Sequence, residues 1–226
     1  ELVGNAKRDW EIVGPLLRRE AIASENAESC RTTLGLNPTA PLLLVTGGSQ
    51  GARSINRTMA EVARSGGIPK GWSVLHQSGG EDSATLEKAY ATADVPARVV
   101  DSIDEMGVAW GAAVLSISRC GAGTVAEALA SATPSVFLPF PHYRDDHQSH
   151  NARAMVESGG ARLVPDAVDA VANATTLRPV LDELFNSPST LESMRAALEA
   201  IRPDPEASAR GLAKLVQERL QAIQAR

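Results

Sequence analysis

Cysteines, long apolar runs and clusters of basic residues are scarce in this chain of 226 residues. Its two cysteines, Cys30 and Cys120, form neither a disulfide framework nor a zinc-ligand pattern, which favours a reducing compartment. No apolar stretch approaches the roughly 18 residues that a membrane-spanning helix needs, and no signal-peptide pattern is found. The net charge of −5, with no run of Lys or Arg, argues against binding to nucleic acid or to an anionic membrane.

The overall amino-acid composition is that of a globular protein. Hydrophobic residues make up 43% and charged residues 22% of the chain, which suffices for a packed core. The length permits one large or two small domains. Residue 1 is Glu rather than Met, and the first residues read like the middle of a polypeptide. We therefore expect a fragment of a longer protein.

Short apolar runs alternate with helix-compatible segments along most of the chain, which predicts an α/β fold: a Rossmann-like, doubly wound parallel sheet of about six strands with C-terminal helices. Several runs are apolar throughout, as in strands covered on both faces. The expected strands are 42–46, 72–76, 98–100, 113–117, 135–138 and 161–164. The expected helices are 52–64, 82–92, 104–110, 122–131 and 148–158.

The last third of the sequence reads as helical. Pro188, Pro203 and Pro205 each suit the start of a helix. An apolar stripe with helical spacing follows on the final segment, and we expect it to pack into a core rather than to bind a partner. The stripe consists of Leu212, Leu215, Val216, Leu220 and Ile223.

A glycine-rich loop, "VTGGSQGARSIN", follows the first expected strand directly. In open parallel sheets ligands bind beyond the carboxyl ends of the strands. Glycines there let backbone N–H groups approach a ligand, and the next helix adds its positive end. We predict that Gly47, Gly48 and Gly51 form a phosphate loop, with Ser49 and Gln50 adding side-chain hydrogen bonds. A tight turn without a ligand is the alternative, because neither a P-loop nor the dinucleotide fingerprint is present.

A second glycine loop, "SISRCGAGTVAEAL", follows the fourth expected strand. Thr124 suits either a helix cap or a ligand contact. Glu127 is expected in the first turn of the helix, where its carboxylate could accept hydrogen bonds from ribose hydroxyls or serve only as a first-turn charge. Two such loops at one edge of a sheet suggest a ligand with two ends, such as a nucleotide sugar.

A polar segment, "PFPHYRDDHQSHNA", follows the fifth expected strand. Its histidines and aspartates are ligand types for transition metals, but their spacing matches no helical His-x-x-x-His pair with a third ligand. We therefore interpret the segment as a loop and a helix start, capped by Asp145 or Asp146, with Gln148 and Asn151 facing the crevice. A metal-dependent hydrolase is the remote alternative.

Together, "GGSQGARSIN", "SIDEM", "SRCGAGTVAEAL" and "PFPHYRDDHQSHNA" closely resemble the carboxyl-terminal half of the MurG family. These are the peptidoglycan N-acetylglucosaminyltransferases that form lipid II from lipid I. The motifs occur in matching order and separation over essentially the whole chain. The resemblance implies one half of a GT-B fold, whose carboxyl-terminal half holds UDP-N-acetylglucosamine.

By motif, the resemblance implies that Ser49 and Gln50 lie near the diphosphate, the Ile103 backbone near the uracil edge and Glu127 at the ribose. Loop amides and a hydroxyl come from Ala122, Gly123 and Thr124. Gln148 and Asn151 reach the sugar, although one extra residue before Asn151 leaves His147 as a substitute for Gln148. Arg18 matches the family's interdomain arginine better than Arg8 does. Ser102 replaces an aromatic residue and so loosens one wall of the base pocket.

The resemblance also implies a division of the chain and of the reaction. Residues 1–25 are expected to form an interdomain linker or the start of a domain, and residues 26–226 the UDP-sugar donor domain. The amino-terminal acceptor domain, with the general base for lipid I, is expected to be absent, so no catalytic residue is assigned. The whole protein would be an inverting hexosyltransferase without a protein-bound metal or cofactor, peripheral on the cytoplasmic face of the plasma membrane. Two alternative functions remain. One is another GT-B enzyme, such as a glycolipid glycosyltransferase or a nucleotide-sugar epimerase, and the other is a non-catalytic subunit that binds a nucleotide sugar.

Overall fold

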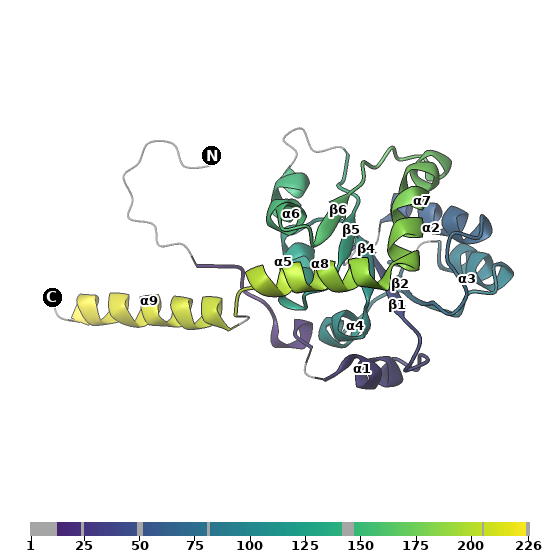
Figure 1. The fold of residues 1–226 in the computed structure, drawn as a ribbon. Coiled ribbons are helices and arrows are strands. Elements are labelled where there is room, and N and C mark those ends of the chain that lie inside the picture. Colours follow the sequence, from purple (N-terminus) through teal and green to yellow (C-terminus); the bar gives the residue numbers. More distant parts are fainter. Residues whose placement is uncertain are drawn as a thin grey trace. The chain divides into compact units, whose positions relative to one another are not determined.

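Six parallel strands form one sheet in the computed structural model of the chain, which describes residues 13–23, 25–48, 52–80, 82–141, 147–204 and 206–224. The strand order is β3-β2-β1-β4-β5-β6, and Figure 1 labels all of these strands except β3. The bounds are β1 (Leu42–Thr46), β2 (Ser73–Gln77), β3 (Ala97–Val100), β4 (Leu115–Ser118), β5 (Ser135–Phe137) and β6 (Ala161–Leu163). Each strand begins and ends within about two residues of a predicted one, and the predicted Rossmann-like α/β fold is confirmed.

Strand β1 is buried along its whole length and sends alternate side chains into two cores. Leu43 and Val45 belong to one hydrophobic core, and Leu42 and Leu44 belong to the other. Because successive side chains of a strand point to opposite faces, a strand that is apolar at every position needs cover on both faces. The continuous apolar run in the sequence therefore corresponds to a sheet between two layers of helices.

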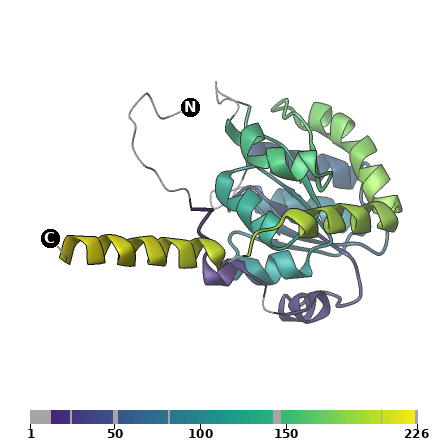
Figure 2. The ribbon, with the colours of Figure 1, turned by 60° about the vertical axis from the view of Figure 1, so that its left-hand side comes forward.

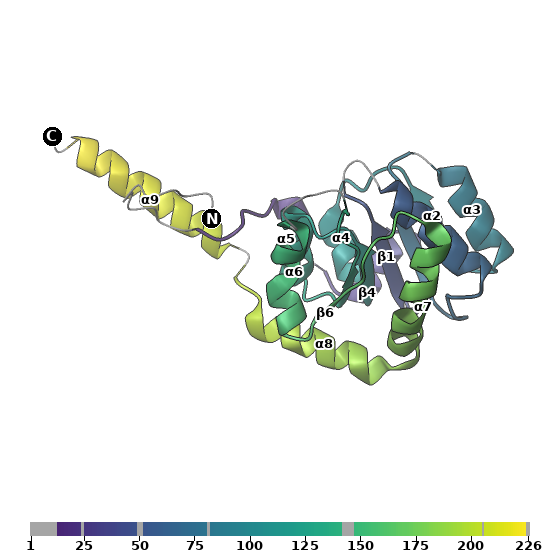
Figure 3. The same ribbon diagram turned by 90° about the horizontal axis from the view of Figure 1, so that it is seen from above.

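Helices cover both faces of this sheet (Figure 3). One core packs beneath α2 (Arg53–Arg64), α3 (Ser83–Thr92) and α7 (Ala170–Asn186). The other packs beneath α1 (Ala27–Thr33), α4 (Met106–Ala112), α5 (Ala122–Ala130) and α6 (His147–Glu157). The five helices predicted between strands are confirmed within about two residues by α2 to α6.

Helix α8 (Pro188–Ile201) crosses from one face of the sheet to the other (Figures 2 and 3). Its first half contributes Leu191 and Met194 to the core beneath α7, and its second half contributes Leu198 to the core beneath α6. Pro188 occupies the start of this helix as predicted, because an N-terminal position needs no backbone N–H. Pro203 follows the helix, and Pro205 lies outside the described residues.

The chain divides into two compact units, residues 17–203 with the sheet, and residues 1–16 together with 204–226. The second unit contains helix α9 (Ala207–Gln224), none of whose described side chains is buried. Leu212, Val216, Leu220 and Ile223 are 38%, 50%, 54% and 70% exposed. The prediction that this stripe packs into a core is therefore wrong, because neither hydrophobic core includes a residue of α9. None of the described helices is long and apolar enough to cross a membrane.

A buried polar network joins β2 to the helices α2 and α3. The ring of His76 lies 2.8 Å through Nδ1 from the hydroxyl of Tyr90 and 3.1 Å through Nε2 from Oδ1 of Asn56. Since Oδ1 of Asn56 can only accept, Nε2 carries the proton and Nδ1 accepts from Tyr90. Burial away from water lowers the pKa of His76 to about 3. The ring is therefore neutral in the folded protein.

We expect the stability of the protein to fall as the pH drops below about 6.5. The unfolded chain gains a proton on His76 there, whereas the folded protein does not until about pH 3. This linkage lowers the free energy of unfolding by about 1.4 kcal/mol between pH 7.5 and 5.5. Urea unfolding at the two pH values measures the loss. A His76→Leu variant removes the titrating group. It should be less stable than the wild-type protein at both pH values, but it should not show the part of the pH dependence that His76 causes. If the variant keeps the full pH dependence, the assignment to His76 is contradicted.

Candidate functional site

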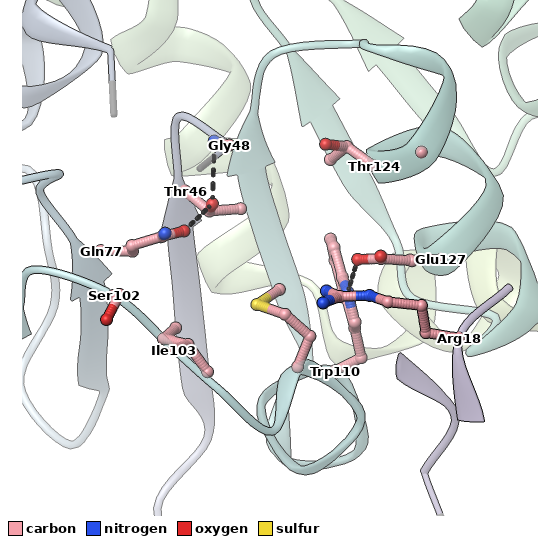
Figure 4. Close-up of a pocket in the computed structure, with 11 residues that line it drawn as sticks. Arg18, Thr46, Gly48, Gln77, Ser102, Ile103, Trp110, Thr124 and Glu127 are labelled. Carbon is pink, nitrogen blue, oxygen red and sulfur yellow. Dashed lines mark hydrogen bonds between the residues drawn. The ribbon is translucent and has the colours of Figure 1, made fainter. Parts of the chain in front are cut away.

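A pocket of about 340 Å³ opens at the carboxyl edge of the sheet, where the strand order reverses between β1 and β4. Ligands of open α/β sheets bind at such a reversal. Figure 4 shows Gln77, Ser102 and Ile103 on one side of this pocket, and Thr124, Glu127 and Arg18 on the other. The full lining is Arg18, Thr46, Gly48, Gln77, Ser102, Ile103, Met106, Trp110, Gly123, Thr124 and Glu127.

The first glycine loop begins at the end of β1. Gly48 has a φ of +81°, which only glycine adopts without strain. A Cβ at this position would meet nothing within 4 Å, so the backbone angle and not a neighbouring atom requires glycine here. Gly47 precedes it and is half-buried. Ser49, Gln50 and Gly51 lie outside the described residues, and their predicted roles at a phosphate stay predictions.

The second glycine loop leads from β4 into α5. Gly121 precedes the helix and no side chain caps its amides, so Thr124 does not serve as the cap. Gly123 and Thr124 line the pocket, and Ala122 begins the helix with an exposed side chain. The uncapped N–H groups and the positive end of the helix dipole make this end of α5 suited to an anion.

Glu127 lines the same pocket but does not lie where the sequence predicted. Helix α5 begins at Ala122, which places Glu127 in the second turn and not in the first. The helix dipole acts mainly within the first turn, so another group has to hold this carboxylate. Trp110 does so: its indole N–H donates to Oε2 of Glu127 over 3.0 Å, and its ring is buried. The other carboxylate oxygen, Oε1, accepts no hydrogen bond from the residues that the structure describes.

Arg18 reaches the pocket because the segment behind it packs tightly on α4. The short 3-10 helix η1 (Arg19–Ala21) follows Arg18 directly. A Cβ on Gly107 of α4 would lie 2.5 Å from the carbonyl oxygen of Ile22, so the two backbones approach as closely as glycine allows. The structure thus brings Arg18 to the predicted site. Arg8, the alternative, lies outside the described residues.

The two expected sugar contacts are engaged elsewhere. Gln148 Oε1 accepts from the backbone N–H of Phe140 over 2.9 Å, and Asn151 Nδ2 donates to the carbonyl of Cys120 over 3.1 Å. Both residues tie α6 to the loops that follow β4 and β5, and neither lines the pocket. The side chain of His147, and the predicted caps Asp145 and Asp146, lie outside the described residues. Among the residues that the structure does describe, no group of three potential metal ligands occurs.

A buried ion pair at the carboxyl edge of the sheet was not predicted from the sequence. Arg119, directly after β4, lies 2.7 Å through Nη1 from Oδ2 of Asp166, which follows β6. Ser54 of α2 donates to the same oxygen over 2.6 Å, and Asn173 of α7 donates to Oδ1 over 2.7 Å. Burial alone would raise the pKa of Asp166, but these hydrogen bonds outweigh it and hold the pKa below its ordinary value.

Arg119 also fixes the loop beyond β5. Its Nη1 donates to the carbonyls of Leu138 and Pro139 over 2.8 and 3.0 Å, and its guanidinium lies 5.4 Å from the centre of the Phe140 ring. One side chain therefore connects the ends of β4 and β5, the start of α2 and the segment after β6. The sequence shows a charged residue between a buried strand and a glycine loop, but nothing in it identifies the carboxylate.

Four further lining residues were not predicted as site residues: Thr46, Gln77, Met106 and Trp110. The signal available for Thr46 and Gln77 is a polar residue at the last position of a buried strand. Met106 and Trp110 lie on α4, one turn apart, and their positions resemble ordinary core spacing. Spacing alone therefore could not separate them from the core.

A parallel sheet in this order, with a pocket at the reversal point, defines a Rossmann-like α/β domain. The chain belongs to the glycosyltransferase family 28 C-terminal domain family, whose model matches residues 42–211. This match and the relatives described next confirm the resemblance to the carboxyl-terminal part of the MurG family.

Two curated relatives carry the name UDP-N-acetylglucosamine--N-acetylmuramyl-(pentapeptide) pyrophosphoryl-undecaprenol N-acetylglucosamine transferase. The relative from Gloeobacter violaceus is 37% identical over 219 residues, 96% of this chain and 57% of its own length. The relative from a Nocardioides species is 41% identical over 165 residues, 71% and 44% of the two chains. The chain thus spans about half the length of the curated relatives it matches. The crystal structure of Acinetobacter baumannii MurG superposes with a TM-score of 0.69 at 23% identity, covering 92% of this chain and 57% of that one. The calicheamicin glycosyltransferase CalG4 superposes with a TM-score of 0.57 at 20% identity, covering 91% and 46%.

We expect Asp166→Ala to lower the free energy of unfolding by about 3 kcal/mol, because it leaves the buried Arg119 guanidinium without its charge partner. Denaturant unfolding measures the loss. The exposed pair Arg153–Glu157 has the same 2.7 Å separation, with side chains 69% and 64% exposed, so Glu157→Gln is a control matched in distance but not in burial. Its loss should be far smaller, as for surface ion pairs in general. Equal losses in the two variants would show that the Arg119–Asp166 pair contributes no more than a surface pair.

Proposed function

We propose that this chain is the donor-binding half of an N-acetylglucosaminyltransferase that converts lipid I to lipid II, and that its pocket holds UDP-N-acetylglucosamine. The observation that carries the proposal is the placement of Glu127 and Ile103 on opposite walls of one pocket, beside an uncapped helix N-terminus. A nucleoside diphosphate needs a contact for its base, a hydrogen-bond acceptor for its ribose and a positive dipole for its phosphates. The membership of the glycosyltransferase family 28 C-terminal domain family and the names of the relatives support the same assignment.

In this proposal the uracil edge meets the Ile103 backbone, across the pocket from Arg18 and Glu127. The free oxygen of Glu127 accepts from the ribose hydroxyls. The diphosphate lies between the Gly47–Gly51 loop, with Ser49 and Gln50, and the start of α5 at Ala122, Gly123 and Thr124. The sugar extends toward α6, where Gln148 or His147 and Asn151 contact it. For that contact Gln148 has to exchange its present bond to Phe140 for one to the sugar.

The transfer itself is proposed to be a single displacement that inverts the sugar. The backbone amides at the two glycine loops stabilise the charge that develops on the departing UDP, so no protein-bound metal is required. The attacking hydroxyl of lipid I needs a general base, and we assign that base and the acceptor site to the part of the relatives' length that this chain does not match. The whole protein would act peripherally at the cytoplasmic face of the plasma membrane, where a polyprenyl acceptor is available.

Titration calorimetry of this chain with UDP, 2′-deoxy-UDP and ADP tests the proposal. We expect UDP to bind more tightly than ADP, and Glu127→Gln to reduce UDP affinity by about 1.5–3 kcal/mol because it removes the charge from an acceptor of ribose hydroxyls. The wild-type protein should prefer UDP to 2′-deoxy-UDP, and the variant should lose most of that preference.

The outcomes separate the parts of the proposal. Equal binding of UDP and ADP would remove the pyrimidine assignment, and equal binding of UDP and 2′-deoxy-UDP would remove the ribose role of Glu127. Among UDP-sugars, a preference for one other than UDP-N-acetylglucosamine would indicate a different GT-B enzyme. A donor bound tightly, with transfer to lipid I restored by a separate partner chain, would indicate a non-catalytic subunit.

The glycine at position 48 gives a second prediction. Gly48→Ala should cost about 1 kcal/mol of stability, because φ is +81°, and should also weaken UDP binding at least tenfold, because its methyl group occupies the space in front of the loop amides. Gly159→Ala is the matched control: Gly159 has a φ of +86° and equally open space around its Cβ, but it lies between α6 and β6, away from the pocket. Thermal unfolding and calorimetry on both variants should show similar destabilisation and a loss of affinity in Gly48→Ala alone. If both variants bind UDP equally well, the loop glycine only turns the chain.

A further inference from the structure

A short chain of hydrogen bonds crosses the pocket wall from the first glycine loop to strand β2. The backbone N–H of Gly48 donates to Oγ1 of Thr46 over 3.1 Å, and the Thr46 hydroxyl donates to Oε1 of Gln77 over 2.5 Å. Thr46 and Gln77 are paired in register at the last positions of β1 and β2. They are only 2% and 5% exposed, yet both line the pocket. Figure 4 shows the bonds and the amide oxygen turned to Thr46.

These two hydrogen bonds fix the direction of the Gln77 amide. In the structure the Thr46 hydroxyl accepts from the N–H of Gly48 and donates its own proton to the amide oxygen of Gln77, which can only accept. The amide nitrogen is therefore the polar group that Gln77 has left for the pocket. It has no hydrogen-bond partner among the residues that the structure describes. A nearly buried donor without a protein partner gains most from a ligand atom that accepts a hydrogen bond.

The position of Gln77 indicates which part of a ligand it faces. Gln77 is paired in register with Val100 on β3, and the chain continues from β3 to Ser102 and Ile103. These two residues lie with Gln77 on the same side of the pocket, opposite Thr124 and Glu127 (Figure 4). If the ribose lies at Glu127 and the base at Ile103, the donor of Gln77 faces the base.

We propose that Gln77 selects the base of the donor nucleotide: its oriented N–H₂ group donates to a carbonyl oxygen at C4 of a pyrimidine, and Thr46 is the positioning residue that sets the direction of the amide. The proposal rests on the proposed function, since it takes a uridine nucleotide as the ligand. Uracil has an oxygen acceptor at C4, whereas cytosine has an amino group that would oppose the donor of Gln77. Cytidine nucleotides are therefore discriminated against at this atom.

Calorimetric titration with UDP and CDP tests this directly, because the two nucleotides share their diphosphate and ribose. The wild-type protein should bind UDP at least tenfold more tightly than CDP. Gln77→Glu, measured at pH 8 so that the carboxylate is ionised, keeps the acceptor for Thr46 but replaces the donor by a second acceptor. The UDP-to-CDP affinity ratio should then fall at least tenfold. Gln77→Met removes the amide at similar length and should lower the ratio severalfold, while the Ile103 backbone keeps its contact with the uracil edge.

Variants of Thr46 test the positioning role. Thr46→Val keeps the shape but removes the hydroxyl, so the amide is free to turn over, and the UDP-to-CDP ratio should fall severalfold. Thr46→Ser keeps the hydroxyl and should preserve the wild-type ratio. Thermal unfolding of each variant establishes that folded protein was titrated.

The outcomes distinguish this inference from the function on which it rests. If the wild-type protein binds UDP but Gln77→Glu or Gln77→Met weakens UDP and CDP equally, Gln77 serves the phosphates or the fold and the inference is overturned, while the donor-binding proposal stands. A folded Thr46→Val variant with an unchanged ratio would overturn the positioning role. If the wild-type protein binds neither nucleotide, both the proposed function and this inference are wrong.

Discussion

The parallel pairing of β1 with β2 on one side and β4 on the other is the constraint on which the site depends. Parallel strands place all their carboxyl ends at one edge of the sheet, and the reversal of strand order between β1 and β4 leaves the two glycine loops to diverge there. Residues far apart in the sequence, such as Gly48 and Thr124, therefore line one pocket. The helices on both faces keep the paired strands out of water and so make this geometry rigid.

Three polar side chains at that edge share one physical feature. Each is held in place by hydrogen bonds to other protein side chains, without a ligand. Trp110 holds Glu127, Thr46 holds Gln77, and Asp166 with Ser54 holds Arg119. Buried polar groups are costly unless they are paired, so each of these residues has a preferred orientation. A site built in this way loses little side-chain freedom when it binds, which favours affinity.

The sequence predicted the fold well because two of its patterns were strong: short, largely apolar runs such as that of β1, and glycine loops directly after β1 and β4. It predicted the loops of the site for the same reason. It failed where the answer depended on distant partners. The carboxylate that pairs with Arg119, the indole that holds Glu127 and the turn of α5 in which Glu127 lies all depend on tertiary packing or on a helix start that Gly121 sets. For α9 the periodicity predicted the helix and its apolar face, but it could not show whether anything packs against that face.

Helix α8 has a consequence for how the domain holds together. The sheet separates its two hydrophobic cores, and such layers could in principle loosen independently. Leu191 and Met194 are anchored in one core and Leu198 in the other, where Leu198 packs so closely on Gly160 that a Cβ there would lie 2.3 Å from its side chain. The helix therefore acts as a clamp across the edge opposite the pocket. Loss of packing in either layer would release the helix from both, so residues 17–203 are built to unfold as one cooperative unit.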